Sequence, residues 1–134
     1  MTIPMLLGMA SCGLSFCGGD VGGFVGDPDE ELLIRWYQSG IFYPFFRGHS
    51  TINTRRREPW LYSSQAEKMM KEAILLRYRL LPYIYTAFYR YTQDGYPIIR
   101  PVWMDFGKNY GTEEQILFGD SLLASPIVSQ YQTR

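Results

Sequence analysis

The sequence has 134 residues, the length of one ordinary domain, and 46% of them are hydrophobic, which is enough for a buried core and excludes a disordered chain. Thirteen Lys and Arg residues balance thirteen Asp and Glu residues, so no strong overall field attracts nucleic acid or anionic lipid. One histidine and two cysteines exclude a zinc constellation and a disulfide framework.

The apolar opening predicts a buried helix over residues 3–10 and a short strand over residues 13–19, in which Leu14 and Phe16 alternate toward the core. This stretch has no basic leader and is interrupted by Gly and Ser, so it predicts neither a signal peptide nor a membrane span. Cys12 and Cys17 are expected to be buried thiols. A glycine-rich turn that holds Asp20 follows the strand.

A second helix is predicted over residues 27–40. Asp27 is the expected N-cap, Pro28 occupies the first helical position, Glu30 completes a capping box and Gly40 ends the helix. The expected buried face consists of Leu32, Leu33, Trp36 and Tyr37.

A second apolar run, residues 41–46, reads as another buried strand, and it ends in the polar residues Arg47 and His49. After a basic loop, a long helix is predicted from a capping box of Ser64 and Glu67 to Gly95, with a kink at Pro82. Its predicted apolar stripe is Met69, Ala73, Leu76, Leu80, Ile84 and Phe88.

Beyond Gly95 the pattern becomes extended and is punctuated by prolines, which predicts the beginning of a small β domain. We therefore expect one unit over residues 1–94 and a second over residues 95–134. Helices and strands alternate in the first unit, as in α/β proteins with a parallel sheet, and both predicted strands end in polar residues, where α/β barrels carry their sites. Two strands cannot close a barrel, so we expect that earlier βα units are missing from this chain.

The stretch GGDVGGFVGDPDEELLIRWYQSGIFYPFFRGHS closely resembles the signature of glycoside hydrolase family 31, the α-glucosidase family. The runs RRREPWLY, LLRYRLLPYIYTAFY and IIRPVW are similar to the glucosidase II branch of that family, and Gly19 stands where alanine is more usual. The resemblance implies an α/β fold, the C-terminal portion of a TIM (β/α)8 barrel, followed by the start of an all-β sandwich domain.

The resemblance implies a retaining α-glucosidase of the endoplasmic reticulum that removes terminal α-linked glucose from N-linked glycans and needs no metal or organic cofactor. Its implied partners are a glucosylated oligosaccharide and a non-catalytic β subunit. The family's nucleophile and acid/base segments, Trp-x-Asp-Met-Asn-Glu and Gly-Asp-Asn, do not occur in this sequence, so no catalytic residue is assigned and the chain alone is expected to be inactive. Alternatives are a starch- or maltose-type α-glucosidase, an α-xylosidase or a non-catalytic truncated fragment.

Four residues are candidates for substrate binding. From the residues alone, Asp20 is expected to satisfy backbone amides of the glycine turn; the resemblance places it at the floor of a sugar pocket, where its candidate partner is Arg47 or an arginine on the missing part. A lone His49 is typical of a hydrogen-bonded structural residue, whereas the resemblance implies that it binds glucose hydroxyls. Phe24 is either a core residue or, by resemblance, an apolar face for the pyranose ring.

Other motif residues are given structural roles. Arg35 and Trp36 are expected to form an ion pair and to pack on their helix. The charge cluster of residues 55–58 reads as a solvated loop, with the alternative that it shapes the pocket rim and is anchored by Trp60.

Overall fold

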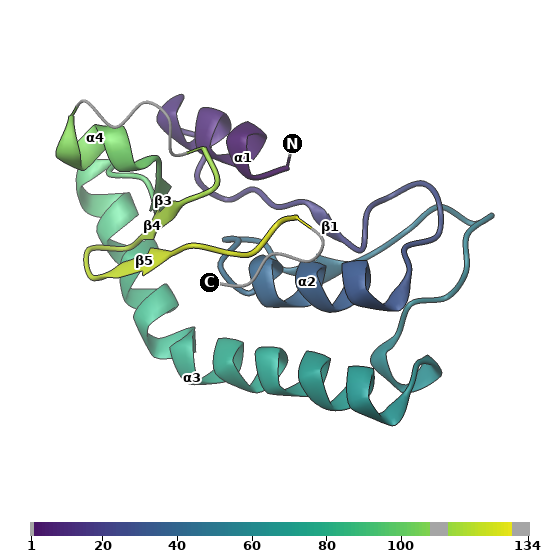
Figure 1. Ribbon diagram of the computed structural model, residues 1–134. Coiled ribbons are helices and arrows are strands. Elements are labelled where there is room, and N and C mark those ends of the chain that lie inside the picture. The colour runs from purple at the N-terminus through teal and green to yellow at the C-terminus, as the bar shows by residue number, and fades with distance from the viewer. Residues whose placement is uncertain (1, 108–112, 130–134) are drawn as a thin grey trace.

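The computed structural model describes residues 2–107 and 113–129. Up to residue 94 the elements are α1 (Thr2–Ser11), β1 (Asp20–Val21), α2 (Glu30–Gly40), β2 (Arg47–Gly48), the 3-10 helix η1 (Pro59–Leu61) and α3 (Ser64–Asp94). They are followed by β3 (Ile99–Arg100), α4 (Val102–Phe106), β4 (Ile116–Phe118) and β5 (Leu122–Ala124). Helix α2 lies along the first half of the long helix α3, and the sheet of β3, β4 and β5 and the helix α1 lie beside its second half (Figure 1).

Helix α1 confirms the first predicted helix, and its buried residues Ile3, Leu6, Leu7 and Ala10 form one face. The next segment is extended, but the predicted strand over residues 13–19 is wrong, since strand pairing begins only at Asp20. The predicted inward residues are also wrong, because Leu14 and Phe16 are 59% and 66% exposed. Ser15 is buried instead, because its hydroxyl accepts a hydrogen bond from the Ile98 amide at 3.2 Å.

The two cysteines differ in burial. Cys17 is buried as expected, and desolvation raises the pKa of its thiol, whereas Cys12 is exposed, contrary to the prediction. Ser15 and Cys17 are both buried, and the chain bends between them, where the Cys17 amide donates to the Ser15 carbonyl at 3.0 Å.

Strands β1 and β2 are parallel, with Asp20 opposite Arg47 and Val21 opposite Gly48, and α2 is the crossover between them. The true N-cap of α2 is Asp29, whose carboxylate accepts the Leu32 amide at 2.8 Å, so the predicted start at Asp27 is two residues early.

The buried face of α2 is narrower than predicted. Leu33 and Tyr37 are buried and Trp36 is partly buried, but Leu32 is 48% exposed. The predicted strand over residues 41–46 is also wrong, because these residues form turns in which Ile41 and Tyr43 are buried, and β2 begins only at Arg47.

Helix α3 starts one residue after its N-cap, Ser63, which accepts the Ala66 amide, so the predicted cap at Ser64 is wrong by one position. The predicted end is confirmed, since Gly95 closes the helix in the left-handed conformation with a φ of 74°. The helix bends near its middle, where Pro82 removes a backbone donor, as predicted (Figure 1). Its buried residues are Ala66, Met70, Ala73, Arg77, Ile84 and Ala87.

Only part of the predicted stripe of α3 is buried. Ala73 and Ile84 are buried and Leu80 and Phe88 pack against the core, but Leu76 is 40% exposed. The largest deviation is Arg77, a buried guanidinium on the apolar face, where it donates to three carbonyl oxygens of the turns over residues 41–46.

After α3 the chain forms an antiparallel sheet in the order β3, β4, β5, and a short helix, α4, occupies residues predicted to be extended. The apolar residues of this sheet, among them Ile99 and Phe118, share one core cluster with α1 and with the second half of α3. A second cluster joins β1, α2 and the first half of α3. The predicted boundary near Gly95 coincides with the end of α3, but no gap in the core marks it.

Candidate functional site

The ends of the two parallel strands bring Asp20 and Arg47 together. Both Nε and Nη2 of Arg47 donate to Oδ1 of Asp20, at 3.0 and 2.6 Å. The carboxylate side chain is 19% exposed and the arginine side chain 49%. The predicted partnership is therefore confirmed, and Oδ2 of Asp20 accepts no hydrogen bond from any residue that the structure describes.

Phe24 and His49 meet where the loops after β1 and β2 run together. Their ring centroids are 5.7 Å apart and their planes are tilted by 31°. The Thr51 amide donates to the Phe24 carbonyl at 2.9 Å, which ties the two loops at the backbone. Phe24 is 50% exposed and His49 is exposed, so neither is a core residue. All four candidates thus lie on two neighbouring strand ends and the loops that follow them.

The loop that carries Phe24, residues 22–26, is held by Arg57. This side chain is only 5% exposed; Nη1 donates to the carbonyls of Gly22, at 2.8 Å, and Gly23, and Nη2 donates to that of Gly26 at 2.9 Å. The sequence interpretation missed this contact, because a run of three arginines looks like a solvated surface. The signal available was a nearby loop rich in glycines, whose carbonyls need donors and whose side chains supply none.

The rest of the basic loop behaves differently. The Arg56 guanidinium is exposed and pairs with Glu58, as a solvated loop should. The Arg55 guanidinium lies 4.8 Å from the Tyr62 ring centroid, while its amide donates to the Asp27 carboxylate. The proposed anchor Trp60 is 64% exposed; Tyr62 packs against the core in its place.

The start of α2 is fastened to the same loop region. The Glu30 carboxylate accepts hydrogen bonds from the Ser63 hydroxyl at 2.7 Å and the Ser63 amide at 3.1 Å, and these hydrogen bonds hold the pKa of Glu30 below its usual range. Glu30 therefore links α2 to the N-cap of α3 and does not complete the predicted capping box.

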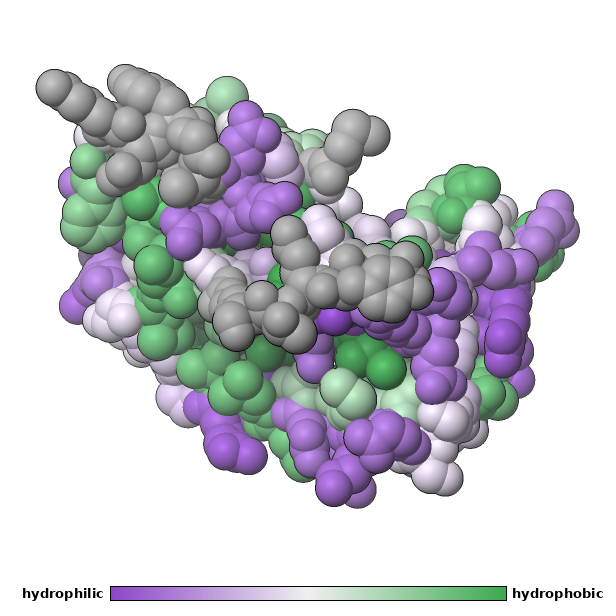
Figure 2. All heavy atoms as spheres, in the orientation of Figure 1, coloured by the Kyte–Doolittle hydropathy of each residue, from purple (hydrophilic) through white to green (hydrophobic). Residues whose placement is uncertain are grey.

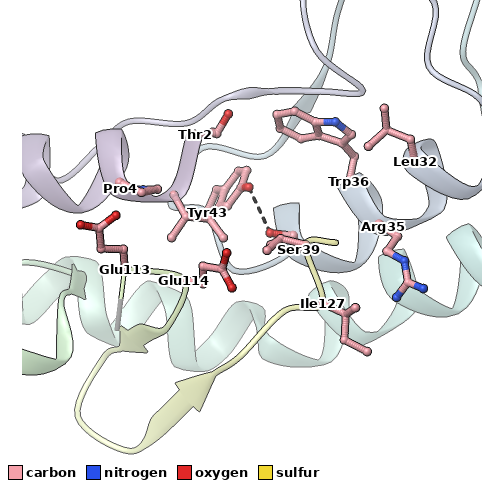
Figure 3. Close-up of a pocket in the computed structure, with 12 residues that line it drawn as sticks. Thr2, Pro4, Leu32, Arg35, Trp36, Ser39, Tyr43, Glu113, Glu114 and Ile127 are labelled. Atoms are coloured by element: carbon pink, nitrogen blue, oxygen red, sulfur yellow. Dashed lines mark hydrogen bonds between the residues drawn. The ribbon is translucent and has the colours of Figure 1, made fainter. Parts of the chain in front are cut away.

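A cavity of about 360 Å³ lies away from these strand ends, between the beginning of α1, the helix α2 and residues 127–128 (Figure 3). The Tyr43 hydroxyl and the Ser39 hydroxyl are 3.0 Å apart on its wall, and burial raises the pKa of Tyr43. Arg35, another lining residue, pairs with Glu31 at 3.0 Å, which confirms its predicted ion pair.

Two further cavities, of about 360 and 260 Å³, lie near the end of α3 and beside α4. None of these three cavities is lined by Asp20, Phe24, Arg47 or His49. Phe24 and Val25 are exposed, and Figure 2 shows hydrophobic atoms at the surface of the loops at the upper right of the molecule.

Within residues 2–107 and 113–129, no three His, Cys, Asp or Glu side chains are grouped closely enough to hold a metal ion. No helix in the same residues has the length and apolar character needed to span a membrane.

Family models match both parts of the chain. Residues 1–87 match the TIM-barrel domain of glycosyl hydrolases family 31, and residues 95–134 match the C-terminal domain of the same family. These matches confirm the predicted fold class, in which a portion of a TIM barrel precedes the start of a second domain.

Individual relatives are similar over nearly the whole chain. Human neutral alpha-glucosidase C is 46% identical over 136 residues, which cover 99% of this chain and 15% of that protein. A crystal structure of glucosidase II alpha subunit in a Glc1Man2-bound form has a TM-score of 0.93 and 46% identity, covering 98% of this chain and 15% of its own.

A third similar structure is an ER glucosidase II heterodimeric complex of the catalytic subunit with the binding domain of the regulatory subunit. Its TM-score is 0.92 at 46% identity, and the match covers 98% of this chain and 15% of that one. The chain therefore spans about one seventh of the length of the relatives that it matches. By both of its family models and by its identity to these relatives, the chain belongs to glycosyl hydrolase family 31.

Proposed function

We propose that this chain is a segment of a retaining α-glucosidase that hydrolyses terminal α-linked glucose, and that it supplies one wall of the glucose subsite. The observation that carries the proposal is the meeting of the Asp20–Arg47 ion pair and the Phe24–His49 ring pair at two neighbouring strand ends in a family 31 chain. This is the edge where α/β barrels bind their substrates.

Each of the four residues has chemistry that suits a hexose. Arg47 holds Asp20 through one carboxylate oxygen, which leaves the other oxygen to accept a sugar hydroxyl. A neutral His49 ring offers one donor and one acceptor, which suits two adjacent hydroxyls. The exposed Phe24 ring offers an apolar face for the C–H surface of a pyranose.

The bond-breaking carboxylates are assigned to polypeptide outside these 134 residues. A retaining glycosidase needs two carboxyl groups about 5 Å apart across the scissile bond, one as the nucleophile and the other as acid and then base. Asp20 is paired with Arg47 through one oxygen and is assigned to sugar binding, and Glu30 is bound to Ser63, the N-cap of α3. This segment therefore binds and orients the sugar, and the intact enzyme performs the displacement.

We further propose that the substrate is a glucosylated N-linked glycan and that the enzyme works in the endoplasmic reticulum with a non-catalytic β subunit. Support comes from 46% identity to a glucosidase II alpha subunit bound to Glc1Man2 and to the ER heterodimer with its regulatory subunit. Starch- or maltose-type α-glucosides and α-xylosides remain the alternative substrates. We also propose the division of the chain at Gly95, supported by family matches that end at residue 87 and resume at residue 95.

The test uses the full-length polypeptide that contains this chain, with an aryl α-glucoside as substrate. Removing a donor that stabilises the transition state costs about 10²-fold in rate, so His49→Ala is expected to lower kcat/KM by about that factor. Gln38→Ala, at an exposed position on α2, is the control. An unchanged kcat/KM for both His49→Ala and Phe24→Ala would contradict the proposed subsite.

Two comparisons complete the test. The 134-residue chain alone should not hydrolyse the aryl glucoside, and turnover by it would refute the assignment of both carboxylates to other polypeptide. Glucosylated high-mannose glycan should be a better substrate than maltose for the full-length protein; the reverse order would favour a starch-type enzyme.

A further inference from the structure

We propose that Arg57 is a positioning residue for the sugar site, which fixes the loop of residues 22–26 so that Phe24 faces His49. The proposal rests on the proposed function, because it assigns a purpose to the geometry of that same site. Arg57 is not one of the four candidate residues and donates no hydrogen bond to their side chains; it acts through the backbone of the loop.

Three left-handed glycines aim their carbonyls at one guanidinium. Gly22, Gly23 and Gly26 have φ values of 95°, 81° and 79°, a region that residues with a Cβ rarely adopt. A Cβ at Gly22 would lie 3.0 Å from Cδ and 3.1 Å from Nη1 of Arg57, so the loop backbone closes tightly around the arginine. A chain with this much glycine has many conformations, and the three hydrogen bonds select one of them.

Arg57 is a buried charged residue without a carboxylate partner among the residues that the structure describes. It is 5% exposed, it forms no ion pair with the residues that the structure describes, and its Nε is buried without a hydrogen-bond acceptor. A buried charge without a carboxylate is costly, and an unpaired buried donor adds to that cost. Among the residues that the structure describes, the three loop carbonyls are the only groups that accept hydrogen bonds from this guanidinium, so Arg57 acts on the backbone of the loop.

The fixed loop bears directly on the sugar site. Phe24 sits between the second and third of these glycines, and its carbonyl accepts the Thr51 amide two residues after His49. A loop released from Arg57 would therefore move the Phe24 ring and loosen its contact with the His49 loop at the same time. Lysine is a poor replacement, since its point charge cannot reach three carbonyls as a planar fork does.

The activity test compares Arg57→Lys with Arg56→Lys in the full-length polypeptide, using an aryl α-glucoside. Arg56 is the matched control, since it is the adjacent arginine, is exposed and pairs only with Glu58. Misplacing a substrate-orienting group costs up to about 10²-fold, so we expect kcat/KM to fall by about 10- to 100-fold in Arg57→Lys and to stay unchanged in Arg56→Lys. Part of that loss should be a higher KM, because a displaced Phe24 ring binds the sugar less well. A higher KM also distinguishes this effect from partial unfolding, which lowers the amount of active enzyme and leaves KM unchanged.

A structural readout is independent of the sugar. Hydrogen exchange is measured on the 22–26 loop and on Thr51, whose amide donates to this loop. We expect exchange about tenfold faster in Arg57→Lys than in Arg56→Lys, since the loop loses the bonds that hold it closed.

A second pair of variants covers the case in which Arg57→Lys does not fold. Gly26→Ala strains the loop and Gly13→Ala strains a different turn; both glycines have left-handed φ values, and neither Cβ would meet an atom within 4 Å. Only Gly26→Ala should raise KM and speed exchange in the loop.

The outcomes separate the two proposals. Loop exchange and KM that are the same in Arg57→Lys and Arg56→Lys, or in Gly26→Ala and Gly13→Ala, would overturn the positioning role even if His49→Ala is inactive. Unchanged activity in both His49→Ala and Phe24→Ala would overturn the proposed sugar site, while faster loop exchange in Arg57→Lys would still stand.

Discussion

Two buried arginines hold the two connections of the β1–α2–β2 unit, one before α2 and one after it, and their acceptors differ in exposure. Arg77 donates to the carbonyls of Ile41, Tyr43 and Pro44, all of them buried, at 2.6, 2.8 and 3.0 Å. Arg57 also donates to three carbonyls, but Gly23 is only half-buried and Gly26 is exposed. One arginine closes turns inside the core, and the other holds a loop that borders solvent.

Because of this difference, we expect the two arginines to contribute unequally to stability although their side chains are equally buried. Both guanidiniums are nearly inaccessible, at 8% and 5% exposure, and desolvation lowers the pKa of Arg77. What differs is the fate of the carbonyls when the arginine is removed. Gly23 and Gly26 are accessible to water, whereas Ile41, Tyr43 and Pro44, whose carbonyls Arg77 binds, are all buried.

The largest effect is expected for Arg77→Met. Three buried carbonyls would lose their donors, and each buried unsatisfied group costs about 1–3 kcal/mol, so the free energy of unfolding should fall by about 3–5 kcal/mol. Denaturant unfolding followed by circular dichroism measures it. A smaller fall in the free energy of unfolding for Arg77→Met than for Arg57→Met would contradict the proposed difference between the two arginines.

A smaller loss of stability is expected for Arg57→Met. Water can replace the arginine at Gly23 and Gly26, so the free energy of unfolding should fall by about 1–2 kcal/mol in the same denaturant experiment. If Arg57→Met and Arg77→Met destabilise equally, solvent does not reach the loop and the distinction between the two arginines is wrong.

A third buried arginine, Arg100, is paired with a carboxylate, so its contribution to stability should depend on pH, unlike those of Arg57 and Arg77. Arg100 is paired with Asp105, at 2.8 Å between Nη2 and Oδ2, and hydrogen bonds from Arg100 hold the pKa of Asp105 below its usual 3.8. Because the folded state binds this proton less readily than the unfolded state, the pair stabilises the fold above the usual pKa and loses that contribution as pH falls through the lowered pKa. The stability difference between wild type and Asp105→Asn should therefore be constant above about pH 5 and shrink in stronger acid.

The Arg57 and Arg77 variants provide the control for that pH series. Neither arginine forms an ion pair with a carboxylate among the residues that the structure describes, so the stability losses caused by Arg57→Met and Arg77→Met should not vary between neutral pH and pH 3.5. A loss that shrank in acid would reveal a carboxylate partner for one of them.

The smallest effect is expected for Arg56→Gln. Its side chain is 72% exposed and its ion pair with Glu58 lies at the surface, where such pairs contribute little. The midpoint of thermal unfolding should not change measurably. A clear decrease would show that the charge cluster acts as a unit and that Arg57 does not stand apart from its neighbours.

Much of the fold could be predicted from the sequence because it depends on local signals. Helices α1 and α3 and the left-handed stop at Gly95 follow from periodicity and capping chemistry. The predicted caps were misplaced by one or two residues because Asp27 and Asp29, and likewise Ser63 and Ser64, are chemically alike. Which member of each pair caps its helix depends on contacts such as that between Asp27 and the Arg55 amide.

The strands were the least predictable elements. Apolar runs at residues 13–19 and 41–46 have strand composition, but in this chain pairing is confined to two residues on each side. In the first run, Ser15 faces inward and accepts a hydrogen bond from the amide of Ile98, a residue far away in the sequence. Alternation with a period of two does not indicate which of the two sets of residues faces inward.

For the site, the sequence offered Arg47 as one candidate partner of Asp20, because both residues follow apolar runs, and the parallel pairing of β1 and β2 brings the two together. It did not identify Arg57, because composition does not distinguish it from Arg55 and Arg56. Only the three-dimensional path of the glycine loop separates these three side chains.

The sheet β3–β4–β5 buries Ile99 and Phe118 in the same core cluster as α1 and the second half of α3. Because this core cluster is shared, replacing residues 95–134 by the corresponding segment of another protein is difficult. The new segment would have to pack against Ile3, Leu6 and Ile84 as well as form its own sheet. Independent recombination of the two parts of the chain that match family 31 models is therefore disfavoured. Substitutions in the sheet and in the helices that pack against it are expected to accumulate in compensating pairs.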